Sequence, residues 1–179
     1  MKRDILLTLF AGLILTISSY FIYPVWSIMV SLWFLAVISI KLKRLDKSLS
    51  LKEKNLFNIY IFFYPISETI IRLIMINIES PPFLNRIEHL YWTFSLVILF
   101  LPIIKKFTIK FSKIQKLLFI ICFVSFIGNL NEFFEYLLRY YNQVQNLGLF
   151  YSDTIFDMVI NIIGSMLGFF TLEVIDKSQ

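Results

Sequence analysis

Two apolar segments near the C-terminus carry carboxylates at helical spacing. In residues 117–141, Glu132 and Glu135 are three positions apart, so a helix would place both on one face. In the last segment, polar and small residues recur at intervals of four, four, three and four: Asp153, Asp157, Asn161, Gly164 and Gly168. Carboxylates that face one another in a low dielectric need a proton, an arginine or a metal cation. The spacing therefore predicts a polar site between two helices.

Three further ionisable residues can join this site. His89 begins another apolar segment, while Glu68 and Arg72 are four positions apart in a third and could also form a simple intrahelical ion pair. An ionisable side chain costs at least about 2.5–3.5 kcal/mol at the centre of a membrane helix, which makes such residues functional candidates. We expect one convergent group: Glu68, Arg72, His89, Glu132, Glu135, Asp153, Asp157 and Asn161.

A histidine among several carboxylates suits a divalent ion such as Mg²⁺, Mn²⁺ or Zn²⁺. Such an ion could polarise an ester or phosphoryl oxygen and activate water. In this hypothesis His89, Glu135 and Asp157 are ligands and Asp153 is a further candidate ligand. Glu132 is a base or a ligand, and Arg72 contacts phosphate. Glu68 and Asn161 support the site.

The composition predicts that these residues lie in a membrane protein. The chain has 179 residues, of which 58% are hydrophobic and 16% charged, and its mean hydropathy is +0.77. This leaves too little polar surface for a soluble domain of that size. The net charge of +5 does not indicate a nucleic-acid partner, because the basic residues lie between apolar runs without a nucleic-acid-binding motif.

Six apolar runs approach the length of about 20 residues that a membrane helix needs. They predict a single integral membrane domain over residues 1–179, an all-α polytopic bundle with helices at about 5–22, 25–40, 56–78, 87–104, 117–141 and 154–175. Lysines and arginines are concentrated before the first run, between the second and third, and between the fourth and fifth. The opposite loops carry few, with Arg86 as the exception. The positive-inside rule then places both termini in the cytoplasm. We expect the protein to lie in the inner (cytoplasmic) membrane.

Three motifs resemble a known family. They are Arg86-Ile-Glu-His89, Asn131-Glu-Phe-Phe-Glu135, and Asp153-Thr-Ile-Phe-Asp157 followed by Asn161 and Gly164. Together they resemble the YjdF-type bacterial inner-membrane family, with a weaker similarity to VanZ-like proteins. The resemblance implies a shared fold and places the family's polar positions on His89, Glu132, Glu135, Asp153, Thr154 and Asp157. It covers residues 86–168 and implies no particular reaction.

Three functions remain open. The first is a metal-dependent enzyme acting on a lipid or lipid-linked headgroup, since the predicted site lies at headgroup depth in the outer half of the bundle. The second is a small proton- or ion-coupled transporter whose carboxylates titrate as ions pass. The third is an accessory membrane subunit whose polar network fixes helix packing. All three have membrane lipids as partners, and the oligomeric state stays open.

Overall fold

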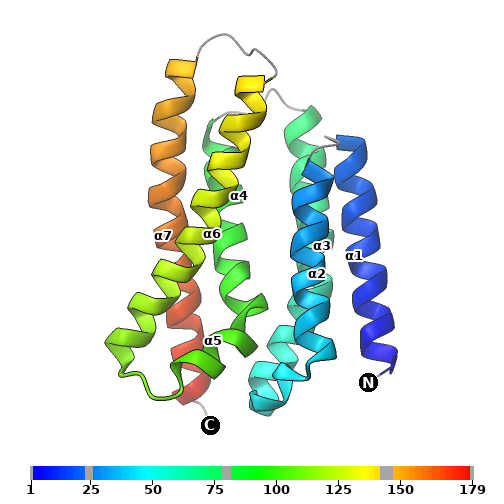
Figure 1. Cartoon of the computed structure of the whole chain (residues 1–179), viewed down its shortest axis with the longest axis vertical. Helices are drawn as coiled ribbons and strands as arrows, with labels where there is room; N and C mark the ends of the chain where they lie inside the picture. The colour runs from blue at the N-terminus through cyan, green and yellow to red at the C-terminus, as the bar shows by residue number, and fades with distance from the viewer. Residues whose placement is uncertain (1, 23–25, 78–81, 142–146, 178–179) are drawn as a thin grey trace. The chain divides into compact units, whose positions relative to one another are not determined.

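The structure is a computed structural model that describes residues 2–22, 26–77, 82–141 and 147–177, apart from the side chains of Arg72, Glu135 and some other residues. All the elements it describes are helices, which confirms the all-α prediction. In chain order (Figure 1) these are α1 Lys2–Ile22, α2 Trp26–Leu42, the short 3₁₀ helix η1 Leu45–Ser48, α3 Leu51–Asn77, α4 Pro82–Leu99, α5 Leu101–Thr108, α6 Lys113–Tyr141 and α7 Leu147–Lys177.

The helices form two compact units. The first contains α1, α2, η1, α3 and α5; the second contains α4 up to Val97 together with α6 and α7. In the first unit α1 packs against both α2 and α3, and in the second α6 packs against α7. The prediction of one integral membrane domain over residues 1–179 stays a prediction.

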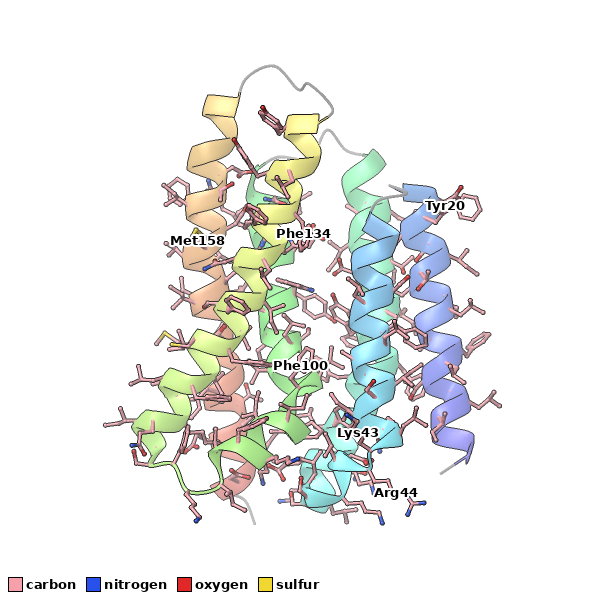
Figure 2. All side chains as sticks on the ribbon, viewed as in Figure 1. Tyr20, Lys43, Arg44, Phe100, Phe134 and Met158 are labelled. Atoms are coloured by element: carbon pink, nitrogen blue, oxygen red, sulfur yellow. The ribbon has the colours of Figure 1, made fainter. Side chains whose placement is uncertain are left out.

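The helices cover the predicted apolar runs, except that the fourth run is broken. We expected one helix over 87–104, but α4 ends at Leu99 and α5 begins at Leu101, with a bend of 59° between them. Pro102 explains the break, because it has no amide proton to donate to the carbonyl four residues earlier and its ring disfavours helical geometry in the preceding residue. The amides of Ile103 and Ile104 instead bond to the carbonyl of Phe100, whose side chain is labelled in Figure 2.

Polar contacts fix the first unit where α3 begins. Ser50 and Glu53 form a capping box, since the Glu53 carboxylate accepts the Ser50 amide at 2.8 Å and the Ser50 hydroxyl accepts the Glu53 amide at 3.4 Å. The same carboxylate is buried and pairs with Lys105 of α5 at 2.5 Å. This ion pair holds α5 against α3.

The surface of α1 is apolar on the side that faces away from its neighbours. Leu6, Phe10, Leu13, Ile17 and Phe21 are exposed, at helical spacing. An apolar stripe of this length needs an apolar partner or solvent.

Two helices among the described residues are long and apolar enough to cross a membrane. These are the stretches Lys113–Phe134 of α6 and Asp153–Asp176 of α7, with 22 and 24 residues. A third span results if α4 and α5 cross together as one bent segment. The composition and length of these helices make a membrane bundle plausible.

Candidate metal centre

Close packing in the second unit brings three helices to one site. On α7, a Cβ atom at Gly164 would lie 2.7 Å from the carbonyl oxygen of Leu90, and one at Gly168 would lie 2.7 Å from the side chain of Val97. Both neighbours belong to α4. The small residues therefore let α4 approach α7 closely, so this surface of α7 is a helix contact.

The polar faces of α6 and α7 also meet. A Cβ atom at Gly128 of α6 would lie only 2.5 Å from the side-chain nitrogen of Asn161 of α7. One turn farther along α6 is Glu132, which lies beside Asp157 of α7. The glycine thus makes room for the asparagine, and the two stripes that the sequence singled out face each other here.

His89 of α4 lies between the two carboxylates. Its Nε2 atom is 3.5 Å from Oε1 of Glu132 and 3.5 Å from Oδ2 of Asp157. One ligand atom from each of the three residues falls within 4.8 Å of the other two. All three residues are buried, with exposed fractions of 7%, 5% and 2% for His89, Glu132 and Asp157. Each comes from a different helix.

The side chains of two asparagines contact this group. Oδ1 of Asn161 lies 3.3 Å from Nδ1 of His89, and Nδ2 of Asn85 donates a hydrogen bond to Oδ2 of Asp157 at 3.0 Å. When the imidazole proton is on Nδ1, it is donated to Asn161, and Nε2 keeps its lone pair. That lone pair then faces the two carboxylates. Metal-binding histidines in proteins are oriented in this way by a second polar group.

The distances fit a shared cation. Two ligands about 2.1 Å from a tetrahedral zinc ion lie about 3.4 Å apart, which is close to the 3.5 Å between Nε2 and each carboxylate oxygen. A protonated His89 in direct charge-assisted hydrogen bonds would approach its acceptors to about 2.7–2.9 Å. Two buried carboxylates on one nitrogen also repel each other strongly, since a low dielectric screens little. A cation between the three residues would relieve that repulsion, so the group could hold a metal ion.

The structure brings together part of the predicted set. His89, Asp157 and Glu132 form the group itself, where Glu132 has the position of a ligand, and Asn161 supports it. Asp153 lies one turn before Asp157 in α7, is partly exposed and is not one of the three.

The other predicted residues are not placed at this group. Thr154 is partly exposed in the first half of α7. The side chains of Glu135 and Arg72 lie outside the described residues. Glu68 is buried in α3, in the first unit. Their assignment to the site stays a prediction.

Sequence reasoning missed Asn85 and did not assign a role to Arg86. Asn85 precedes His89 by four residues, so a helix places both on one face, and this spacing was a usable signal. The guanidinium carbon of Arg86 lies 4.5 Å from the ring centroid of Phe156. Phe156 is the residue before Asp157 in the sequence. Arg86 could have been singled out from the sequence because it is a positively charged residue in a segment that carries few others.

Comparison of the chain with known proteins found no matching family model, no similar curated protein and no similar solved structure. The resemblance to the YjdF-type and VanZ-like families therefore stays a prediction.

Proposed function

We propose that this chain is a multi-pass membrane protein that binds one divalent metal ion through His89, Glu132 and Asp157 and uses it to act on a lipid or lipid-linked headgroup. One observation carries the proposal. An imidazole nitrogen and two carboxylate oxygens, each from a different helix, converge within 4.8 Å in a buried position. Nitrogen and oxygen ligands in this number suit Zn²⁺ or Mn²⁺, and Mg²⁺ is a further candidate.

The proposed topology has about six spans, with both termini in the cytoplasm and the protein in the inner membrane. Two or three membrane-length helices support it, as do the six apolar runs of the sequence. Figure 2 adds that Lys43 and Arg44 lie at one end of the first unit, while Tyr20 lies at the other. Basic residues on the cytoplasmic side and tyrosines at the outer interface are the usual pattern. The motif resemblance to the YjdF-type family agrees with this placement.

Three protein ligands would leave the ion an open coordination position, as catalytic zinc sites do. That position could take water or a substrate oxygen, and the ion would then act as a Lewis acid. Glu132 could also serve as a general base if the substrate displaces it from the metal. Arg72 keeps its predicted role as a phosphate contact. Lipids are the proposed substrates because Glu132 and Asp157 lie in membrane-length stretches of α6 and α7.

Metal counting tests the binding step. Detergent-purified protein is dialysed against Zn²⁺ or Mn²⁺ and its bound metal is measured by mass spectrometry. We expect about one ion per chain in the wild type and little in Glu132→Gln, which keeps the shape of the side chain but removes its charge. Glu173→Gln is the matched control, since Glu173 also lies on a membrane-length helix but pairs with Lys113 and Lys116.

The control variant should retain the ion. Absence of metal in the wild type under all loading conditions would exclude the metal-dependent function. The structural reading, in which the three residues only fix helix packing, predicts this absence together with a lower melting temperature for Glu132→Gln.

Two further assays distinguish an enzyme from a transporter. Metal-loaded protein is incubated with labelled phospholipids, and the same protein in liposomes is assayed for movement of the ion across the bilayer. We expect metal-dependent headgroup release without ion flux. Flux without release would favour the transporter.

A further inference from the structure

Arg86 is a cation beside the proposed metal site with no assigned role. It lies in α4, and its guanidinium group lies 4.5 Å from the ring centroid of Phe156 in α7. Its Nε atom is buried and has no hydrogen-bond partner among the residues that the structure describes. The residue as a whole is partly exposed.

Arg86 lies close in the sequence to residues of the metal site. Asn85, the residue before Arg86, donates a hydrogen bond to Oδ2 of Asp157. His89 follows Arg86 by three residues in α4, which is less than one helical turn. Phe156 precedes Asp157 in α7. The stacked ring thus restrains the guanidinium group between α4 and α7, on residues that adjoin Asn85 and Asp157 in the sequence.

The charges indicate what this arginine binds. A divalent ion with two carboxylates and a neutral imidazole has no net charge, so the metal centre alone attracts an anion weakly. Arg86 adds one permanent positive charge and a planar set of donors that matches the oxygens of a phosphoryl group. A phosphoryl oxygen could then enter the open coordination position while its neighbours bond to the guanidinium group.

We propose that Arg86 binds the phosphoryl group of the substrate beside the metal ion, which makes the substrate class a phosphate ester. This inference rests on the proposed metal-binding function. The phosphoryl group belongs to either a lipid headgroup or a soluble phosphate compound, because the same donors recognise both.

Calorimetric titration of metal-loaded protein tests the proposal with two probes, inorganic phosphate and dihexanoylphosphatidic acid. Metal content is first measured for every variant. We expect Arg86→Gln to keep its metal ion and to bind both probes at least about tenfold more weakly than the wild type, since a charge-assisted hydrogen bond is lost. Arg86→Lys should show a smaller loss. Lys113→Gln, which removes a more distant cation from α6, should bind as the wild type does.

The outcomes are distinguishable. A wild type without stoichiometric metal overturns the proposed function and this inference together. Loaded metal with equal phosphate affinity in the wild type and Arg86→Gln overturns the role of Arg86 alone. Phe156→Leu provides a second variant that keeps the arginine; weaker phosphate binding with retained metal would support the stacking argument. Tighter binding of the lipid than of inorganic phosphate would assign the headgroup as the source.

Discussion

The two ring nitrogens of His89 have different neighbours, as the ring nitrogens of metal-binding histidines do. Nδ1 lies 3.3 Å from Oδ1 of the Asn161 side chain, whereas Nε2 lies between Glu132 and Asp157. Spacing alone predicted which residues share a helical face, so Glu132 and Asp157 could be chosen from the sequence. Spacing could not reveal which nitrogen of His89 is held, or that Asn85 bonds to Asp157, because those contacts join different helices.

Asn161 should tune metal affinity without being a ligand. In Asn161→Leu the imidazole loses the acceptor that orients it, so we expect metal affinity to fall about 10–100-fold, as is usual when such a partner is lost. In Asn161→Asp a carboxylate can accept the same proton, and affinity should stay near that of the wild type. A competition titration with a chelating dye measures both. Equal affinity in Asn161→Leu and the wild type would exclude the orienting role.

At the scale of the helices, glycines decide how closely the site can assemble. Asn161 has an exposed fraction of 0%, and Gly128 leaves the space that its side chain occupies. The spacing of Gly164 and Gly168 is visible in the sequence, but it does not show that α4 is the helix that contacts them. It also predicted a continuous fourth helix, although Pro102 was visible. A proline shows where a helix can break, but whether it breaks there depends on tertiary packing.

Replacing Gly164 with alanine should separate α4 from α7. The added methyl group would collide with the Thr93 hydroxyl and with the carbonyl oxygen of Leu90. We expect a loss of about 1–3 kcal/mol in stability, typical of overpacking, together with weaker metal binding. Thermal unfolding in detergent and metal titration measure the two effects. Ile163→Ala, at an exposed neighbouring position, is the control for metal binding. Unchanged metal affinity in a destabilised Gly164→Ala would show that the site does not depend on this contact.

At the scale of the whole molecule, the apolar runs and the placement of lysine and arginine predicted a helical membrane protein. Two or three of the helices have the length and composition for this. All three candidate ligands belong to the second unit, which contains α4, α6 and α7. Residues from the first unit, such as Glu68, could be assigned to the same site only by assuming how the units pack. Sequence spacing carries no information on that packing.

Topology can be tested with single cysteines, because Cys122 is the one native cysteine. In a Cys122→Ser background, Ser48→Cys and Phe83→Cys place a thiol at two exposed positions, in η1 and at the start of α4. We expect a membrane-impermeant thiol reagent to label Phe83→Cys in intact cells, and Ser48→Cys only after the cells are opened. The reverse pattern would place the termini outside.

The most direct test of the metal centre uses the fact that His89 is the only histidine in the chain. Tag-free protein is loaded with one equivalent of Mn²⁺, and pulsed electron paramagnetic resonance records whether a nitrogen nucleus couples to the ion. We expect the coupling of a single imidazole nitrogen in the wild type and its disappearance in His89→Gln. Stoichiometric Mn²⁺ with no nitrogen coupling in the wild type would contradict it, because the ion would then be bound by oxygen atoms elsewhere.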